Sequence, residues 1–264
     1  MKLLQRLQPT PSTTRSLPSF LIAFAAVSLT MCLHCGTAFA QSNTKSAEQE
    51  QEQEEEGFES LFDGESLEGW SGNPDLWTVA DGAITGTTTE ENRITKNQFI
   101  TWTGGELKDF ELRLKFKIAN GNSGIQFRSK PVGEEGAYRV HGYQADIDPS
   151  MRYMGILFEE GGRKILAERS KKVEITAEGK KEVVGTTGDD AEIVAAIDAT
   201  GWNEYTIRAE GGHIVQSING KVCVDLNDLQ TEKAAKSGIL AFQIHVGPPM
   251  VVQFKDIRLK KLGE

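Results

Sequence analysis

The sequence has few cysteines, no long apolar run and no excess of positive charge. Three cysteines in 264 residues cannot supply the disulfide framework of a small secreted domain. No stretch reaches the roughly 18 apolar residues that a membrane-spanning helix needs. The formal net charge of -9 argues against DNA or RNA as the partner. We therefore expect no stable membrane span, no nucleic-acid partner, and a domain that its own core stabilises.

The first forty residues have the pattern of a secretory signal peptide. Three basic residues and no acidic one begin the chain, and an apolar stretch of fourteen residues covers 20–33. The segment Ala38-Phe39-Ala40 then matches the A-x-A cleavage motif. The alternative, a short membrane anchor, is disfavoured because the stretch is too short and no basic cluster follows it. We predict that residues 1–40 are removed and that the protein is exported, to the periplasm or out of the cell.

Residues 41–59 form a low-complexity acidic segment. They include seven glutamates and one lysine, with almost nothing apolar. Like charges repel one another and there is no apolar surface to bury, so this segment is predicted to be a disordered linker. The remaining residues, 60–264, are predicted to form one folded domain, in which Cys223 is the only cysteine left. An intrachain disulfide is therefore excluded after cleavage.

Glycine is plentiful, and much of the domain alternates between apolar and polar residues. Glycine makes up 27 of 264 residues, about 10% against a usual ~7%, which favours a turn-rich β fold. Residues 110–118 alternate over nine positions, as a strand does when one face lies in a core and the other in water. Residues 213–219 and 221–226 have the pattern of two hairpin arms around Asn219-Gly220, a type I′ turn pair.

These patterns predict an all-β fold. Further alternation over 202–209, 240–246 and 251–262 adds strands, with a bulge expected at Asp256. Only the stretch 191–197, after an acidic cap, looks helical. We predict a two-sheet antiparallel β-sandwich with at most one short helix. The residues predicted for its core are Phe110, Leu112, Leu114, Phe116, Ile125, Phe127, Leu240, Phe242 and Ile244.

Three of the predicted strands carry hydrogen-bonding side chains on the face away from the apolar residues. The polar set is Asn122, Gln126 and Arg128 on the first strand, Gln144, Asp146 and Asp148 on the second, and Gln243 and His245 on the third. If the strands are neighbours, these amide, carboxylate and guanidinium groups form a polar floor that suits a carbohydrate. The alternative is an ordinary solvent-facing surface, although such faces usually carry Lys, Glu and Thr.

Two other uses of the carboxylates are less well supported. A glycosidase of the usual kind needs two carboxyl groups about 5–9.5 Å apart. Here Gln144 stands at the first position of the series Gln144-x-Asp146-x-Asp148, and an amide cannot act as a nucleophile. Calcium needs further acidic ligands near Asp146 and Asp148, which the sequence lacks. No phosphate-binding loop, G-x-S-x-G or H-E-x-x-H motif is present. We therefore expect neither a metal nor a cofactor.

A series of short motifs runs through the domain in order. They are SLFDGESLEGW at 60–70, WTVADG at 77–82, DFEL at 109–112, NSGI at 122–125, GYQAD at 142–146, WNEY at 202–205, ING at 218–220, GILAFQIH at 238–245 and VQFKDI at 252–257. With these motifs the chain resembles the 3-keto-disaccharide hydrolase domain family over about residues 60–262. The resemblance implies a concanavalin A-like jelly-roll sandwich. The chain differs from many members at Gln144 and in the segments 159–163 and 164–199.

The resemblance implies a chemistry that needs no carboxylate pair. A separate sugar 3-dehydrogenase first oxidises the substrate at C3, which makes the C2 proton acidic. A base removes that proton, the glycosidic oxygen leaves from C1, and water adds to the resulting enone. The site then needs a base at C2, a cation or donor at the C3 oxygen, and an acid for the leaving group. The implied activity is hydrolysis of the glycosidic bond in an oxidised disaccharide or glycoside.

Candidates for these roles come mainly from the polar floor. Asp146 and His245 are the candidate bases, and His245 is also a candidate acid for the leaving oxygen. Arg128 is the candidate cation, because a guanidinium keeps its charge at any relevant pH. The candidate substrate-binding residues are Asn122, Gln126, Gln144, Gln243 and Glu159. The alternative for His245 is a strand-end histidine that is bonded only to the backbone.

Two other classes of function stay open from the sequence. One is a secreted carbohydrate-binding module without catalysis, and the other is a structural or partner-binding sandwich. An enzyme should place a titratable group beside a cation in a pocket, whereas a binding module should have a shallow aromatic groove.

Overall fold

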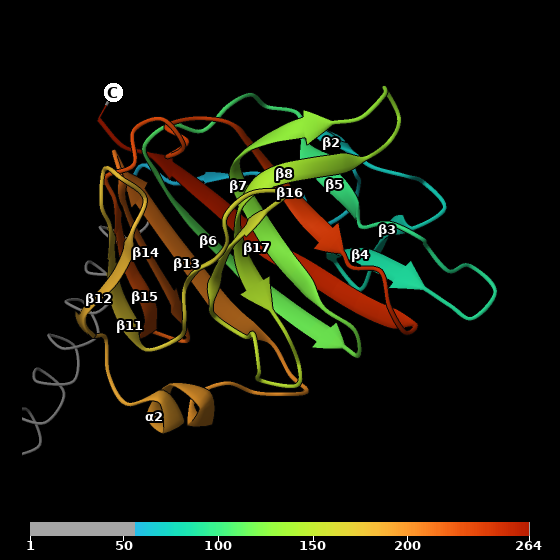
Figure 1. The fold of residues 1–264 in the computed structure, drawn as a ribbon. Coiled ribbons are helices and arrows are strands. Elements are labelled where there is room, and N and C mark those ends of the chain that lie inside the picture. Colours follow the sequence, from blue (N-terminus) through green and yellow to red (C-terminus); the bar gives the residue numbers. More distant parts are fainter. Residues whose placement is uncertain (1–55, 264) are drawn as a thin grey trace, which may run out of the picture. The chain divides into compact units, whose positions relative to one another are not determined.

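Two β-sheets packed face to face make up the fold. The structure is a computed structural model that describes residues 56–263. One short helix, α2 (Asp190–Ala195), lies beside the sheets (Figure 1). Within the described range, no helix is long and apolar enough to cross a membrane. The predicted signal peptide, 1–40, and the predicted linker up to residue 55 lie outside the described residues. The predicted all-β, two-sheet sandwich is confirmed.

The larger sheet has ten strands. In spatial order they are β12 (Lys181–Thr186), β11 (Lys171–Ile175), β15 (Lys221–Asp228), β14 (His213–Ile218), β13 (Asn203–Glu210), β6 (Phe110–Ala119), β17 (Met250–Lys261), β4 (Ala83–Thr88) and β3 (Trp77–Ala80), with β1 (Glu59–Ser60) paired to β17. Neighbours are antiparallel except β11 and β15, which run parallel. The exception arises because the chain enters β11 from the other sheet and not through a hairpin from β15.

The smaller sheet has seven strands. In order they are β10 (Lys164–Ala167), β9 (Leu157–Glu160), β8 (Arg139–Ile147), β7 (Ser123–Val132), β16 (Ile239–Ile244), β5 (Gln98–Trp102) and β2 (Trp70–Ser71). The strands expected to carry the polar floor, β7, β8 and β16, are neighbours at the centre of this sheet. Asn122, Gln144, Asp146 and His245 therefore line one cavity on the outer face of this sheet.

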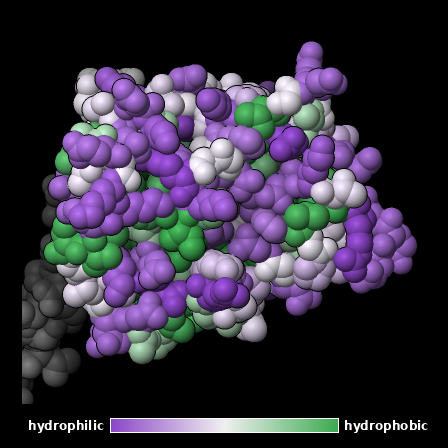
Figure 2. All heavy atoms as spheres, viewed as in Figure 1, coloured by the Kyte–Doolittle hydropathy of each residue, from purple (hydrophilic) through white to green (hydrophobic). Residues whose placement is uncertain are grey.

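Strict alternation places the core between the sheets. In β6 every second residue from Phe110 to Ile118 is buried. All nine residues predicted for the core are at most 1% exposed. The rings of Trp70, Phe242 and Phe254 stack in series, with centroids 4.9 and 4.1 Å apart. The surface in Figure 2 is mostly hydrophilic, with its apolar residues in small separate areas. The large apolar side chains of the core are thus buried between the sheets, where each contributes about 1.5–3 kcal/mol to the stability of the fold.

Three local features, a hairpin turn, a helix cap and a β-bulge, lie where the sequence predicts them. Asn219 and Gly220 have φ values of 48° and 75°, so the β14–β15 hairpin closes on the expected turn. Asp189 caps α2 by accepting hydrogen bonds from two backbone N–H groups of its first turn. The register of β17 shifts around Asp256, whose φ is 51°, which confirms the bulge.

The folded domain begins slightly before the predicted end of the linker. Glu59 pairs with Leu259 of β17. The guanidinium of Arg113 lies 4.5 Å from the centroid of the Phe58 ring. Of the described part of the predicted linker, Glu59 therefore belongs to the sheet, and Phe58 packs beside it because its ring offers an aromatic face to Arg113.

Candidate active site

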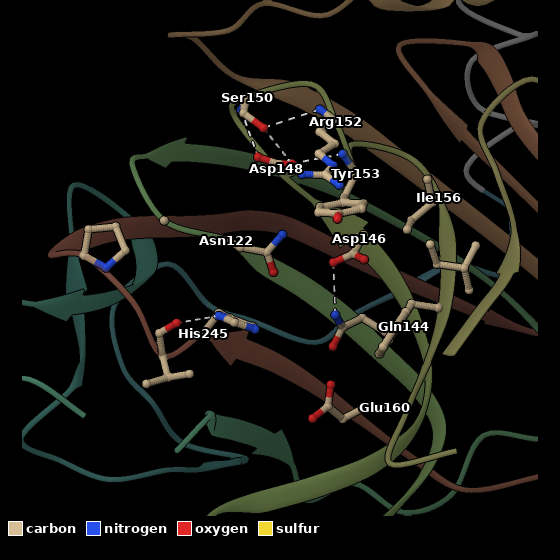
Figure 3. Close-up of a pocket in the computed structure, with 15 residues that line it drawn as sticks. Asn122, Gln144, Asp146, Asp148, Ser150, Arg152, Tyr153, Ile156, Glu160 and His245 are labelled. Carbon is tan, nitrogen blue, oxygen red and sulfur yellow. Dashed lines mark hydrogen bonds between the residues drawn. The ribbon is translucent and has the colours of Figure 1, made fainter. Parts of the chain in front are cut away.

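The outer face of the smaller sheet carries a cavity of about 550 Å³. Residues of β8 form its floor, and the turn after β8, the β9–β10 hairpin and the loop after β16 form its walls (Figure 3). Its polar lining includes Asn122, Gln144, Asp146, Arg152, Glu160 and His245. The volume lies within the range of about 300–1,000 Å³ that small-molecule sites occupy.

The polar side chains of the floor form one chain of hydrogen bonds. The Ser129 hydroxyl donates to Gln126 Oε1 at 2.7 Å, and Gln126 Nε2 donates to Gln144 Oε1 at 2.7 Å. Gln144 Nε2 then donates to Asp146 Oδ1 at 3.0 Å. Gln126 and Gln144 can meet because they are direct cross-strand partners on β7 and β8. The chain ends on Asp146, so the two amides orient that carboxyl group from below.

Asp146 is the perturbed titratable group of the cavity. Its side chain is only 6% exposed, although it points away from the core. Burial raises the pKa of Asp146 to about 7, and the nearby Asp148 and Glu160 charges add to the increase, while hydrogen bonds from Gln144 and Asn122 oppose it. A carboxyl group with such a pKa is both protonated and ionised near neutral pH. It can therefore take up and release a proton there.

His245 lines the same cavity from the end of β16. Its Nδ1 lies 2.6 Å from the carbonyl oxygen of Val246, and its backbone N–H donates to the Asn122 carbonyl at 3.2 Å. A carbonyl only accepts, so the neutral ring carries its proton on Nδ1 and keeps a lone pair on Nε2. His245 is therefore bonded to the backbone, as the alternative interpretation expects, and it also lines the cavity.

The turn after β8 is built on Asp148. This carboxylate accepts from the Ser150 N–H and hydroxyl at 2.9 and 2.8 Å and from the Tyr153 N–H at 2.9 Å. The Asp148 carboxylate therefore holds the turn that forms this wall of the cavity. The turn presents Arg152 and Tyr153 to the cavity, with the guanidinium 4.9 Å from the ring centroid. The site residues Arg152, Tyr153 and Glu160 were missed because turn geometry, and not strand alternation, places the first two.

Arg128 does not reach this cavity, so its predicted place on the polar floor is wrong. The register between β7 and β8 shifts after Phe127, and Arg128 has a φ of 45°. This bulge reverses the expected alternation, and the guanidinium is buried against the carbonyls of Lys108 and Gly211, at 2.6 and 2.7 Å. It also pairs with Asp109 at 2.9 Å. Arg128 joins the ends of the two sheets, and Arg152 is the cation of the cavity.

Glu159 also lies outside the cavity. It is the cross-strand partner of Tyr143, a core residue, so it points inward and pairs with Arg163 at 2.9 Å. Arg163 also pairs with Asp228 at 2.8 Å, and Asp228 accepts the Tyr143 hydroxyl at 2.6 Å. This buried ion network connects the β9–β10 hairpin to the larger sheet. The adjacent residue, Glu160, lines the cavity instead.

The remaining predicted site residues divide into two groups. Asn122, Gln144, Asp146 and His245 meet in the cavity, as the sequence pattern indicates. Gln126 and Gln243 lie on the same sheet but are fully buried and do not line the cavity. Gln126 acts through Gln144, whereas the side-chain amide of Gln243 has no hydrogen-bond partner within the described residues.

The site combines a carboxyl group that titrates near neutral pH, an imidazole and an exposed guanidinium. Asp146 and His245 can move protons, while Arg152 and the amides of Asn122 and Gln144 can stabilise a developing negative charge. Among residues 56–263, no group of three His, Cys, Asp or Glu side chains is arranged to hold a metal ion. The cavity therefore places a titratable carboxyl group and a cation together, and it is not a flat aromatic surface.

Comparison with solved structures shows the same fold in carbohydrate-related proteins. Two proteins of Parabacteroides distasonis ATCC 8503 described as candidate glycosyl hydrolases align with TM-scores of 0.52 and 0.50, each at 19% identity. The alignments cover 80% and 78% of this chain and 97% and 99% of those chains. The carbohydrate-binding module CBM66 of Bacillus subtilis aligns at 0.47 and 15% identity, over 73% of this chain and 96% of its own. No curated protein sequence matches the chain.

The family comparison is more specific than the fold. The sequence profile of the 3-keto-alpha-glucoside-1,2-lyase-like domain matches residues 57–260. That span covers nearly all of the described sandwich, including every residue that lines the cavity. The chain therefore belongs to the 3-keto-alpha-glucoside-1,2-lyase-like domain family, the 3-keto-disaccharide hydrolase family that its sequence motifs resemble.

Proposed function

We propose that this protein cleaves the glycosidic bond of 3-keto-disaccharides or 3-keto-glycosides by elimination followed by addition of water. The observation that carries the proposal is Asp146, a buried carboxyl group with a pKa of about 7 in a cavity of about 550 Å³. A proton next to a ketone is acidic enough for such a base to remove, whereas an unactivated glycoside offers no such proton. Family membership supports the same chemistry.

The elimination step needs a base and a stabilised oxygen. Ionised Asp146 removes the proton from C2, and the C2–H electron pair forms the enolate with the C3 oxygen. The amides of Asn122 and Gln144 and the Arg152 guanidinium supply hydrogen-bond donors for that oxygen. The enolate then re-forms the ketone, C1 and C2 become doubly bonded, and the C1–oxygen bond breaks.

The leaving oxygen and the added water also need proton transfer. His245 lines the cavity and is the candidate acid: in its protonated form it gives the Nε2 proton to the leaving oxygen. In the second half, a water adds to C1 and gives one proton to His245, while C2 takes a proton back from Asp146, so both groups return to their starting states. The net change is one water consumed and one glycosidic bond cleaved, so no oxidant or reductant is required. The 3-keto substrate must come from a separate sugar 3-dehydrogenase.

The proposal is tested by product analysis in heavy water. Purified protein is mixed with a 3-keto-disaccharide or with its unoxidised parent, and released 3-keto-glucose is measured by mass spectrometry. Elimination and addition in D₂O should place one deuterium at C2 of the product during turnover, above the exchange seen without enzyme. The parent disaccharide should remain intact. Cleavage of the parent would contradict the mechanism, whereas release without deuterium at C2 would show that Asp146 returns the same hydrogen that it removed.

Asp146→Asn tests the base directly, with Asp81→Asn as the matched control. Asp81 is exposed in the β3–β4 turn and does not line the cavity. Loss of a general base should lower the rate about 10²–10⁴-fold, while the control keeps its activity. If the wild type and the Asp81→Asn control turn over no 3-keto-glycoside but still bind sugar, the chain is a carbohydrate-binding module.

A further inference from the structure

A second cavity of about 230 Å³ adjoins the first on the outer face of the smaller sheet. Glu160 lines both cavities, so one bound molecule can extend from one to the other across this residue. The second cavity lies toward β5 and the first residues of β8, whereas Asp146 lies toward the end of β8. The two cavities together offer room for two sugar units in a row.

The second cavity is basic. Lys96, Arg139 and His141 line it, and Glu160 is its only acidic residue. Glu160 accepts a hydrogen bond from Asn97 Nδ2 at 3.3 Å, and none of the three basic side chains forms an ion pair within residues 56–263. Lys96 and Arg139 outnumber the single carboxylate by one charge, and the His141 imidazole adds a further hydrogen-bonding group. The excess is local, because the whole chain carries a formal net charge of -9.

The backbone makes room for one of these basic groups. Gly161 has a φ of 66°, and a Cβ atom built there would collide with the His141 ring. Only glycine fits both the conformation and the space, so the hairpin after β9 lets the imidazole pack directly against the Gly161 backbone. The basic cavity is therefore formed by the fold and does not depend on mobile surface side chains alone.

We propose that the second cavity binds the leaving-group half of the substrate and selects a sugar that carries a carboxylate, such as a uronic acid. This inference rests on the proposed function for the order of the two units. The keto sugar occupies the cavity of Asp146, its glycosidic oxygen lies near Glu160, and the acidic unit meets Lys96, Arg139 and His141. Charge complementarity in a partly enclosed site then favours an anionic leaving group over a neutral one.

Binding and turnover test this separately. Methyl glucuronide and methyl glucoside are the probes for binding, followed by calorimetry or ligand-observed NMR. For turnover, two 3-keto-glucosyl substrates are compared, one with glucuronate and one with glucose as the leaving unit. We expect the wild type to prefer the glucuronate compounds by about tenfold in both assays, and the preference to shrink at 0.5 M NaCl as charges are screened.

The variant carries Lys96→Gln and Arg139→Gln together, and the control is Lys233→Gln, an exposed lysine outside both cavities. The double variant should lose most of the preference while its melting temperature stays unchanged, and the control should keep it. Equal binding of the two probes to the wild type, or an unchanged preference in the double variant, would overturn the inference. Preferential binding without any turnover supports the anionic subsite but contradicts the proposed function, and turnover without preference does the reverse.

Discussion

At the scale of single residues, Asp146 determines how activity should respond to pH. The base must be ionised to remove a proton, and burial raises its pKa to about 7. Below that value kcat/KM should fall about tenfold for each pH unit, as Asp146 becomes protonated. Steady-state kinetics between pH 5 and 9 measures this. A flat profile, or a profile that persists in Asp146→Asn, would exclude Asp146 as the base.

The same residue makes a stability prediction with a defined sign. The pKa of Asp146 is raised from 3.8 to about 7 on folding, so the folded state binds the proton more tightly than the unfolded state. Below pH 4 both states are protonated and Asp146 costs nothing. As the pH rises from 4 to 7 the folded state is progressively destabilised, by at most about 4 kcal/mol above pH 7.

Asp146→Asn removes this pH-dependent cost. The variant should therefore gain stability relative to the wild type between pH 4 and pH 7, and the difference should be constant above pH 7. Urea denaturation at pH 4.5 and pH 8 measures it. The gain would also show that function holds a destabilising group in place. An equal difference at both pH values would contradict the raised pKa.

At the scale of elements, β7 supports the cavity-lining face of β8 through a residue without a side chain. Gly124 lies opposite Asp146, and a Cβ atom there would come within 2.5 Å of Gln144 Cγ. Gly124→Ala should therefore displace Gln144 and disturb its hydrogen bond to Asp146. We expect turnover to fall at least about tenfold with a stability loss of about 1–3 kcal/mol.

Gly185→Ala in β12 is the matched control for that substitution. Its nearest neighbour, the Lys172 side chain, would lie at 3.5 Å, an ordinary contact. This variant should keep both its activity and its melting temperature. If Gly124→Ala also retained full activity, the orientation of Asp146 would not depend on Gln144.

The packing of β6 in the core predicts a large loss of stability when its Phe116 ring is removed. The Phe116 ring is fully buried, and its centroid lies 5.8 Å from that of Tyr205. Phe116→Ala should cost about 3–5 kcal/mol, because the sandwich cannot close over the lost ring. Thermal melts of the two proteins measure the loss. An unchanged melting temperature would contradict the assignment of this face to the core.

At the scale of the whole molecule, we propose that the protein is exported. The basic start, the apolar stretch 20–33 and the motif Ala38-Phe39-Ala40 motivate cleavage after Ala40. Intact-mass analysis of the exported protein should show a chain that begins at Gln41. A product that keeps the apolar stretch, or one acylated on Cys32 or Cys35, would contradict the prediction.

Much of the fold follows from local sequence rules. The buried face of β6 can be predicted without knowing its neighbouring strands, because period-two spacing alone puts Phe110 and Phe116 on one face. The same rule places Gln144 and Asp146 together on the opposite face of β8 from Tyr143. The hairpin at Asn219-Gly220 and the cap at Asp189 are likewise encoded within a few residues. The sequence alone therefore determined the fold class, the core and which residues of β8 share the face that lines the cavity.

Only the tertiary structure decided the rest. The bulge after Phe127 moves Arg128 from the outer face to the junction of the sheets, and the pairing of Glu159 with Tyr143 turns Glu159 inward and Glu160 outward. The turn built on Asp148 brings Arg152 to the cavity. Each of these outcomes depends on which strands become neighbours and in what register, and a one-residue shift reverses the face on which every following side chain lies.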